Sequence, residues 1–509
     1  MVPAGYTASM PHPRFEAVNL ISDPVHGYIE LTKRLAPEQS ARAGLPPESA
    51  AEEDLLDTQW LQRMRRISQL QSARWVFPSA EHSRFVHALG VMHEAGLWGQ
   101  ALYPTLREVL RAGASVAGDA DASEPAGPFM ASAGARSPAI PSEALVVETL
   151  RIAGLLHDIG HGPFAHFFDE HVLTRWPAPP HPSRDPEKRL THEDLSQAIV
   201  ERDLGTLVGQ LRRAPAGDPE RAAFADGERI DPRWIGFLVS KPPLSDPTMP
   251  LWVQRVQPLF SGVFTVDNLD YVRRDALMTG VASGLVDADR LRRYAFMSER
   301  GLALYEAGLG ALEMFLTARL FMYNTVYFHR TVRAIDLDLA EAFAPAVDAV
   351  FGDRSPLDAL DDYVMLDEYA LLHQAALWAR GERVDEHPAP RSGCVTPRVA
   401  ELWRGILLRR PTWRAVREVR HDSRSEAARD RVERELRESL GLALRAEPER
   451  FRFDLADADA RPQNPLFVGG RLVVAGRDGS LDATPLGAML ERLPAVVTVG
   501  RVYERIGQE

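Results

Sequence analysis

Apolar residues recur at spacings of three and four between Leu55 and about Phe343. This spacing places apolar side chains on one face of an α-helix, which can then pack against its neighbours. It is clearest in LLDTQWLQRMRRISQL, SRFVHALGVMHEAGLWGQAL, EALVVETLRIAGLLHDI and LGALEMFLTARLFMYNTVYFHRTVRAIDLDLAEAF. The pattern therefore predicts a mainly helical core.

The pattern changes towards both ends of the chain. Near the N-terminus, DPVHGYIELT alternates like a short pair of strands or a turn. Beyond about Pro345, the Arg- and Glu-rich RRPTWRAVREVRHDSRSEAARDRVEREL indicates a solvated helix face, whereas FRFDLAD, RLVVAGR and AVVTVGRVYERI are typical of strands. We therefore expect a helical core over residues 1–345 and a smaller α/β lobe over residues 346–509.

Three stretches rich in Ala, Gly, Ser and Pro predict loops. They are Ala112–Ser142, Trp176–Arg189 and Ala214–Glu228. We expect the first, about residues 112–142, to be a mobile insertion in the core.

Charge and cysteine content narrow the class of protein. The 509 residues carry a formal net charge of −12, which argues against extended binding to nucleic acid but allows a local basic pocket. A single cysteine, Cys394, permits neither an internal disulfide nor a thiolate metal cage. There is no secretory signal pattern and no apolar run long enough to span a bilayer. We expect a cytoplasmic protein that does not contact a membrane.

The stretch AGLLHDIGHGPFAHFFDEH holds four histidines and three carboxylates in nineteen residues. Its His157 and Asp158 are adjacent, so on a helix their side chains diverge by about 100° and can hold an ion from two sides. His87 in HSRFVHALGV and Asp267 in VDNLDYVRRD could complete four ligands. Imidazole and carboxylate donors without thiolates suit Mn, Fe, Mg, Ni or Zn.

Any one of these residues, taken alone, is more often a hydrogen-bonded core histidine or a capping carboxylate than a ligand. Buried deep in LLHDIG, however, Asp158 would need a cation nearby. The combination therefore favours a metal site.

Other polar residues share helix faces. His166 and Asp169 are spaced i, i+3 and can form a hydrogen-bonded dyad. Two longer stripes predict further candidates for a site: Arg319, Tyr323 and Tyr327, and Asp267, Tyr271, Arg274 and Asp275. Such stripes are more often core, but an inward-facing Arg319 needs an anion. For His192, a position at the N-terminus of a helix capped by Thr191 and Asp194 can coexist with a site role.

His87, the His157–Asp158 pair and Asp267 resemble, in this order, the H…HD…D signature of the HD-domain phosphohydrolases. DPVHGYIEL, FPSAEHSRFVHALGV, THEDLS and DNLDYVRRDALMTG also closely resemble the dNTP triphosphohydrolase branch of that family. The likeness covers roughly Asn19 to Phe343. The resemblance implies a helical HD-domain core with one or two divalent ions, and a homo-oligomer, either a dimer or a tetramer.

The resemblance also implies roles for individual residues. The metal ligands would be His87, His157, Asp158 and Asp267. The catalytic group would be His166 with Asp169 beside the α-phosphate, and His161 and His192 on the triphosphate. Substrate contacts would come from Arg84 and Arg319 on phosphates, Tyr327 at C2′ of the sugar, Gln69 and Asp275 on the 3′-hydroxyl, Leu70 near the base, and Tyr271 and Tyr323.

The sequence departs from the family pattern at two places. Asn268 stands where a lysine contacts phosphate in relatives. Asp57, Gln62 and Arg65 resemble residues that recognise an activating guanine nucleotide, but the expected basic residues of that site are replaced by Asn19, Leu304 and Glu306. Nucleotide-triggered assembly is therefore in doubt, and Asp57 and Arg65 could form a plain surface ion pair.

The leading hypothesis is a metal-dependent dNTP triphosphohydrolase that converts dNTP and water into deoxynucleoside and tripolyphosphate by attack at the α-phosphorus. One alternative is a phosphodiesterase or nucleotidase acting on another cyclic or short nucleotide. The other is a non-catalytic nucleotide-binding scaffold.

Overall fold

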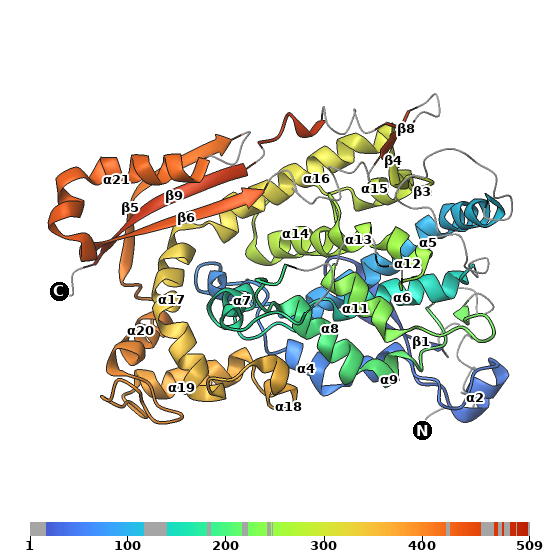
Figure 1. The fold of residues 1–509 in the computed structure, drawn as a ribbon, viewed down its shortest axis with the longest axis horizontal. Helices are drawn as coiled ribbons and strands as arrows, with labels where there is room; N and C mark the ends of the chain where they lie inside the picture. The colour runs from blue at the N-terminus through green and yellow to red at the C-terminus, as the bar shows by residue number, and fades with distance from the viewer. Residues whose placement is uncertain are drawn as a thin grey trace, which may run out of the picture.

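The computed structural model describes most of the chain. The described residues are 17–116, 140–180, 185–215, 222–241, 246, 248–423, 428–459, 473–476, 481–482, 489–494 and 496–506. Figure 1 shows a mainly helical body with a small sheet and a covering helix near the C-terminus. This arrangement confirms the predicted fold class of a helical core with a smaller α/β part.

Two helices form the centre of the core, α5 (Arg84–Val116) and α6 (Glu143–Leu156). Every residue of α6 after its first is buried. The helices approach closely because a glycine stands at their contact: a Cβ atom on Gly154 would lie only 2.8 Å from the carbonyl oxygen of Val91. This contact fixes the start of α5 relative to the end of α6.

Local sequence explains where the site-bearing helices begin. Thr191 and Asp194 form the predicted capping box of α8 (His192–Arg202), with Asp194 accepting a hydrogen bond from the Thr191 amide at 3.0 Å. The side chain of Thr265 caps α14 (Val266–Thr279), which ends at Gly280 in the left-handed region. A short helix, α7 (His166–His171), lies between α6 and α8.

The remaining helices surround this centre. They are α2 (Pro37–Arg42), α3 (Glu52–Leu56), α4 (Gln59–Met64), α9 (Gly205–Val208), α11 (Pro232–Ser240), α12 (Leu251–Val256), α13 (Pro258–Ser261), α15 (Ala288–Tyr294), α18 (Leu360–Tyr363), α19 (Glu368–Ala379) and α20 (Pro397–Leu407). Short 3-10 turns occur at Gln71–Trp75, Leu173–Arg175, Glu306–Gly308, Pro356–Asp358 and Pro448–Arg450.

The predicted N-terminal strand pair is an antiparallel hairpin of β1 (Val18–Asp23) and β2 (Gly27–Thr32). Gly27 has φ +76°, a conformation that suits the tight turn between the strands. The hairpin is tied to the core because Glu52 and Thr32 exchange two hydrogen bonds of 2.8 Å.

The long helical pattern after Leu309 is interrupted. It forms α16 (Leu309–Met322), a π-helical turn (Tyr323–Tyr327) and then α17 (Arg330–Phe351). Such π-helical turns are rare and often occur at functional sites. Here the turn carries two of the predicted substrate residues.

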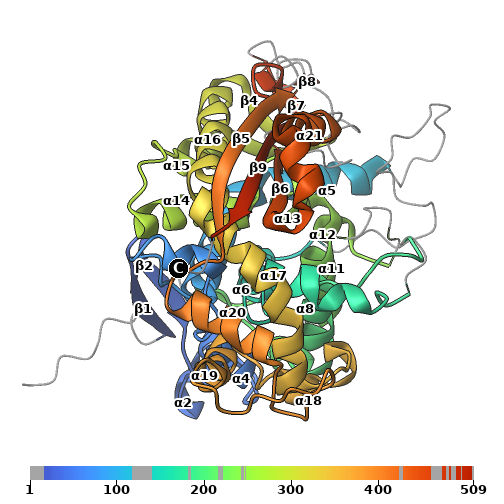
Figure 2. The same ribbon diagram turned by 90° about the vertical axis from the view of Figure 1, so that its left-hand side faces the viewer.

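The C-terminal strands form a three-stranded antiparallel sheet in the order β5 (Trp413–Ser423), β9 (Val496–Arg505), β6 (Phe451–Asp459). Helix α21 (Ala428–Ala446) packs on one face, and the π-helical turn with the end of α16 packs on the other (Figure 2). The core side of this sheet therefore supports Tyr323 and Tyr327.

A second sheet joins the C-terminal part to the core. In it, β4 (Gly301–Tyr305) pairs with β3 (Ala295–Ser298) and, in parallel, with β7 (Val473–Ala475), which pairs with β8 (Leu481–Asp482). Helix α17 runs without interruption through residue 345. The division into units at 345 and 346 stays a proposal.

Two sequence predictions are corrected. The Arg- and Glu-rich segment is helical only in its second half. Its first half forms β5, because pairing with β9 supplies backbone partners and because Glu418 and Arg501 form an ion pair of 2.7 Å across the strands. The loop prediction is wrong at its start, because the segment from Ala112 to Val116 belongs to α5. Residues 117–139 lie outside the described residues.

The other two predicted loops, Trp176–Arg189 and Ala214–Glu228, are described only in part, because residues 181–184 and 216–221 lie outside the described residues. Among the residues that the structure does describe, no helix is long and apolar enough to cross a membrane.

The α5–α6 contact predicts a selective effect on stability. We expect Gly154→Ala to lower the free energy of unfolding by about 1–3 kcal/mol, because the added methyl group meets backbone atoms that cannot move aside easily. Gly113→Ala in α5 is the matched control, since nothing lies within 4 Å of its new Cβ; it should be neutral or stabilising by up to about 1 kcal/mol. Urea unfolding of both variants measures the difference, and equal values would contradict the close packing.

Candidate metal centre and substrate site

The four predicted metal ligands come from three separate segments. His87 lies in the first turn of α5, His157 and Asp158 directly follow α6, and Asp267 lies in the first turn of α14. Both histidines and Asp158 are buried, whereas the Asp267 side chain is 31% exposed. The packing of α5 against α6 and α14 therefore brings the ligands together from positions up to 180 residues apart in the sequence.

Donor atoms of His87, His157 and Asp267 lie within 4.8 Å of one another, and Asp158 lies beside this group. Oδ1 of Asp267 is 3.2 Å from Nε2 of His87 and 3.8 Å from Nε2 of His157. Asp158 places Oδ1 3.2 Å from His157 Nε2 and Oδ2 3.9 Å from His87 Nε2. Donor atoms bound to one ion at about 2.1 Å lie about 3 to 4 Å apart, so these distances suit a shared cation.

Both imidazoles are held through the opposite ring nitrogen. His87 Nδ1 donates to Asp270 Oδ2 at 2.8 Å, and His157 Nδ1 donates to the carbonyl oxygen of Gly154 at 2.8 Å. A donor role for Nδ1 leaves Nε2 as the nitrogen with a free lone pair. Nε2 of His157 is buried without a hydrogen-bond partner among the described residues, which a bound cation would supply.

Charge at the centre also favours a cation. Burial raises the pKa of Asp158 and Asp267, but nearby histidines, together with Arg84 in the case of Asp158, outweigh it and hold both pKa values below the usual range. Burial lowers the pKa of His157. Burial also lowers the pKa of His87, but Asp267 and Asp270 outweigh this effect and raise the pKa to about 10. The donor set of two imidazoles and two carboxylates thus fits a divalent ion.

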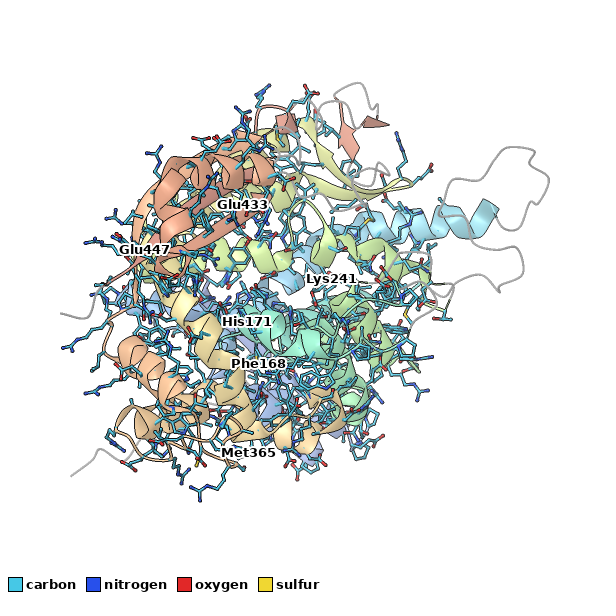
Figure 3. The ribbon with its side chains drawn as sticks, turned by 60° about the vertical axis from the view of Figure 1, so that its left-hand side comes forward. Phe168, His171, Lys241, Met365, Glu433 and Glu447 are labelled. Carbon is cyan, nitrogen blue, oxygen red and sulfur yellow. The ribbon has the colours of Figure 1, made fainter. Side chains whose placement is uncertain are left out.

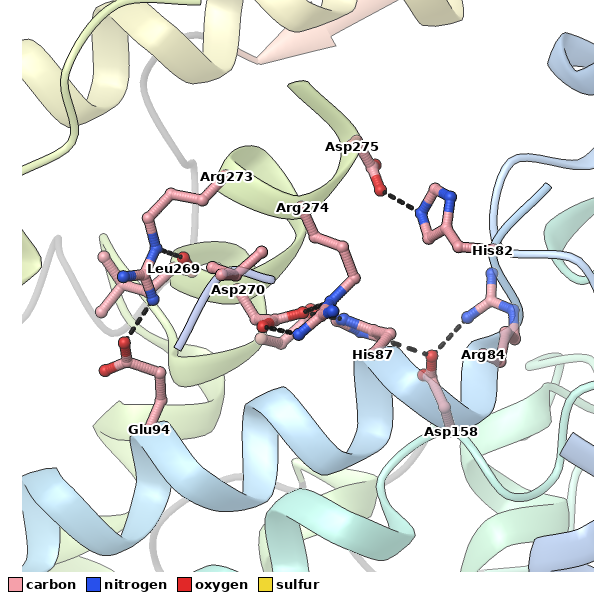
Figure 4. A network of polar contacts seen from close by, with 12 residues as sticks. His82, Arg84, His87, Glu94, Asp158, Leu269, Asp270, Arg273, Arg274 and Asp275 are labelled. Carbon is pink, nitrogen blue, oxygen red and sulfur yellow. Dashed lines mark hydrogen bonds and ion pairs between the residues drawn. The ribbon is translucent and has the colours of Figure 1, made fainter. Parts of the chain in front are cut away.

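Arg84 does not point to open solvent. It is buried and donates a short hydrogen bond to Oδ2 of Asp158 (Figure 4). Arg84 therefore supplies the cationic neighbour that the buried Asp158 was expected to need. Its predicted contact with phosphate stays a proposal.

A second cluster joins the predicted catalytic residues. Oδ2 of Asp169 lies 2.5 Å from Nδ1 of His192, 3.5 Å from Nδ1 of His166 and 3.9 Å from Nδ1 of His161. The rings of His161 and His192 stack with centroids 3.6 Å apart. The closest imidazole to Asp169 is thus His192, not the expected His166, whose side chain is 67% exposed.

The loop before α7 has a strained backbone that packing holds in place. Phe164 and Ala165 both have positive φ, at +59° and +49°, which costs about 1–3 kcal/mol for each residue without glycine's freedom. Packing offsets this cost: the ring of Phe164 lies 5.5 Å from Phe343 of α17, and Phe168 of α7, labelled in Figure 3, is fully buried. Arg63 also donates to the carbonyl oxygen of His161 at 2.7 Å.

The predicted sugar contacts centre on Asp275. Its Oδ2 accepts a hydrogen bond from Tyr327 Oη at 2.6 Å, and its Oδ1 accepts one from His82 Nε2 at 2.9 Å. Gln69 is next to this group, because its backbone N–H donates to the carbonyl oxygen of His82 at 3.0 Å. Its side-chain Oε1 is buried without a hydrogen-bond partner among the described residues. The adjacent Leu70 is buried.

The two predicted stripes meet. Arg319 donates to Tyr271 Oη at 3.1 Å and lies over the ring of Tyr323, 5.4 Å from its centroid. The rings of Tyr323 and Tyr327 are 5.1 Å apart. Tyr271 is one helical turn after Asp267 on α14, so the aromatic group lies close to the metal ligands.

The predicted surface ion pair between Asp57 and Arg65 is wrong. Asp57 pairs instead with Arg34 at 3.1 Å, and Arg65 donates to Gln62 at 3.0 Å while covering the ring of Phe85. The β1–β2 hairpin brings Arg34 close to Asp57, and a local spacing along α4 could not reveal that partner.

Sequence reasoning missed Asp270, His82 and His26 as site residues. Asp270 is one turn from Asp267, and its spacing of four from Arg274 could have indicated a paired buried carboxylate. His82 is five residues before His87 but outside α5. Nothing local marks His26, which reaches the site only through the fold.

Comparisons with known proteins agree with this geometry. A family model described as "HD domain" matches residues 129–222, which include His157, Asp158 and His192. A model described as "HD associated region" matches residues 286–381. The part of the chain that carries the His157–Asp158 pair is therefore similar to the HD domain.

Individual relatives make the relationship more specific. The chain is 26% identical over 382 residues to the uncharacterized protein YwfO of Bacillus subtilis, a match that covers 72% of this chain and 68% of that protein. It is 26% identical over 351 residues to the deoxynucleoside triphosphate triphosphohydrolase SAMHD1 of Homo sapiens, covering 66% of this chain but only 46% of the human protein. These relatives confirm the resemblance to the dNTP triphosphohydrolase branch.

Solved structures support the fold. A hypothetical protein from Aquifex aeolicus aligns with a TM-score of 0.61 at 22% identity, covering 96% of both chains. A phosphohydrolase from Bacteroides thetaiotaomicron aligns with a TM-score of 0.57 at 20% identity, covering 96% of this chain and all of that one. The overall fold is thus shared along nearly the whole chain.

The Asp169–His192 pair predicts a pH effect on stability. Burial lowers the pKa of His192, but Asp169 outweighs it and raises the pKa to about 9. Because the folded state holds this proton more tightly, the stabilisation is fully present below about pH 6.5 and is lost as pH rises through 9. Urea unfolding in the presence of a chelator measures the free energy of unfolding of the wild type and of Asp169→Asn. The difference between the two should become smaller from pH 6.5 to pH 9.

The exposed Asp361 supplies the control, because Asp361→Asn removes a carboxylate away from the cluster. Its stability gap should not change over this range. A gap for Asp169→Asn that is also constant with pH would contradict the charged pair.

Proposed function

We propose that the protein is a metal-dependent dNTP triphosphohydrolase that hydrolyses dNTP to deoxynucleoside and inorganic tripolyphosphate. The water oxygen bonds to the α-phosphorus, the bond from that phosphorus to O5′ breaks, and O5′ takes a proton. The observation that carries the proposal is that one helix, α14, links the two groups: it carries the predicted metal ligand Asp267 and also Asp275, which holds the Tyr327 hydroxyl.

The predicted ligands would hold one divalent ion, whose identity is open. When bound, such an ion lowers the pKa of a coordinated water and offsets negative charge on phosphate oxygens. His87 and His157 would contribute Nε2 of rings fixed through Nδ1, His87 after giving up the proton that Asp267 and Asp270 otherwise hold on it. Asp158 and Asp267 would contribute negative charge.

The residues around the centre divide the remaining tasks. Arg319 is held by Tyr271 in a geometry that could meet the outer phosphates, and Arg84 lies at the metal ligands. His192, kept protonated by Asp169, adds a positive charge to the triphosphate side, with stacked His161 beside it. His166 is exposed enough to reach the leaving O5′ and protonate it.

Selectivity for deoxyribose would rest on Tyr327. Its hydroxyl is fixed by Asp275 at 2.6 Å, and the C-terminal sheet packs behind its ring, so the ring cannot easily yield to a 2′-hydroxyl. Asp275 and Gln69 would recognise the 3′-hydroxyl, and buried polar groups of this kind reject analogues that lack the hydroxyl. We also expect a homo-oligomer, which light scattering after size exclusion would measure.

The test incubates the purified chain with each dNTP and each rNTP in the presence of Mn, Mg, Fe or Co, and separates the phosphate products by ion chromatography. We expect tripolyphosphate from dNTPs and little from rNTPs. Asp158→Asn should lower kcat/KM by at least about 100-fold. Loss of a residue that only hydrogen-bonds to a metal ligand costs up to about 100-fold, and loss of a ligand should cost more.

Asp361→Asn is again the control and should keep full activity. Orthophosphate or pyrophosphate as the main product would point to cleavage of another bond and contradict the proposal. Nucleotide binding without turnover in every metal would favour the scaffold alternative.

A further inference from the structure

A fully buried carboxylate lies directly behind the metal ligand His87. Asp270 of α14 is 0% exposed, and its Oδ2 accepts the hydrogen bond from His87 Nδ1 at 2.8 Å (Figure 4). A carboxylate in this place fixes both the tautomer and the ring orientation of a metal-binding histidine. Asp270 contacts Nδ1 of His87, whereas the predicted ion would bind Nε2 on the other side of the ring.

Asp270 is held from two further sides. Arg274 forms a two-point ion pair with it, from Nε to Oδ2 and from Nη2 to Oδ1, each at 2.8 Å. His26 Nε2 donates to Oδ1 at 2.6 Å. Both carboxylate oxygens are thus fully used, and the carboxylate cannot rotate without breaking several charge-assisted hydrogen bonds.

Two of these contacts lead to the β1–β2 hairpin. His26 lies in its turn, and Asp23 at the end of β1 accepts a hydrogen bond from Arg274 Nη1 at 2.8 Å. The other oxygen of Asp23 accepts from the amides of Val25 and His26, both at 2.9 Å. The conformation of the turn and the position of the Asp270 carboxylate are therefore set by one connected network.

The helix that carries His87 leaves space for this network. A Cβ atom on Gly90, one turn after His87 on α5, would lie 2.0 Å from Oδ1 of Asp270 and 2.4 Å from Nη2 of Arg274. Any other residue at this position would push the carboxylate away from the helix. The close approach of Asp270 to α5 thus depends on Gly90. This glycine is needed for the space it leaves, because it lies within a helix and has no positive φ.

We propose that Asp270, Arg274, Asp23 and His26 form an outer shell that positions His87, and that the β1–β2 hairpin thereby sets the affinity of the metal centre. These are positioning residues, because they reach the ion only through His87. The proposal rests on the metal centre and not on the identity of the substrate. The competing explanation is that the network only stabilises the fold.

Metal binding separates the two explanations without any measurement of activity. Asp270→Asn keeps the size of the side chain but removes its charge and one acceptor. His26→Gln alters the contact from the hairpin to Asp270, together with the contacts of His26 with Glu94 and His93. The matched control is Asp454→Asn, which changes another buried carboxylate, on β6 of the C-terminal sheet, that is paired with Arg333 of α17.

Isothermal titration of the metal-free proteins with Mn²⁺ measures affinity, and the visible absorption of Co²⁺ reports the ligand geometry. We expect Asp270→Asn to weaken Mn²⁺ binding by about 10- to 100-fold and to alter the Co²⁺ spectrum. His26→Gln should weaken binding in the same direction by a smaller factor. Asp454→Asn should bind Mn²⁺ like the wild type.

Thermal unfolding with a chelator shows which variants are folded. If Asp270→Asn does not fold, His26→Gln decides the question. Wild-type Mn²⁺ affinity and an unchanged Co²⁺ spectrum in the folded variants would overturn the proposal, and so would an equal loss of affinity in Asp454→Asn. Because each readout is made without nucleotide, failure of the proposed dNTP reaction would leave this result unaffected.

Discussion

The site depends on one electrostatic constraint, which is that two buried imidazoles must present the same nitrogen to a shared point between two carboxylates. Hydrogen bonds to Asp270 and to the Gly154 carbonyl oxygen fix Nδ1 of His87 and His157, so Nε2 faces Asp158 and Asp267. Burying two carboxylates here is costly unless cations lie beside them. Arg84 is one such cation, and a bound ion would be another. The helices around the site can be understood as the frame that keeps these groups together.

The C-terminal part of the chain has a structural connection to the same site. Its three-stranded sheet packs against the π-helical turn that carries Tyr323 and Tyr327, and Tyr503 of β9 donates to the carbonyl oxygen of Arg330 at 2.9 Å. Arg333 of α17 pairs with Asp454 of β6. The sheet therefore fixes the tyrosines from behind, so that the Tyr327 hydroxyl stays directed to Asp275 and the face of the Tyr323 ring stays against Arg319.

Much of this arrangement could be predicted from the sequence. Helical periodicity identified α5, α6 and α16, and the Thr191–Asp194 spacing identified the start of α8. The family resemblance supplied the predicted ligands His87, His157 and Asp267, which the fold brings close together. These features depend on residues close in sequence or on motifs that many proteins share.

What the sequence could not reveal depends on contacts between distant segments. The partner of Asp169 is His192, which is 23 positions away, and no helical spacing indicates that choice. The sequence of β5 has the charge pattern of a solvated helix, and only its pairing with β9 shows that it is a strand. His26 is 244 positions from Asp270, so only the folded chain shows that the N-terminal hairpin reaches the carboxylate behind the predicted ligand His87.

The most direct test of this account is a crystal structure of the protein grown with Mn²⁺, with anomalous data collected at the manganese absorption edge. We expect one strong peak about 2.0 to 2.3 Å from Nε2 of His87, Nε2 of His157 and carboxylate oxygens of Asp158 and Asp267. A peak bound instead by His161, His166, Asp169 and His192, or no peak at either place, would contradict the central claim.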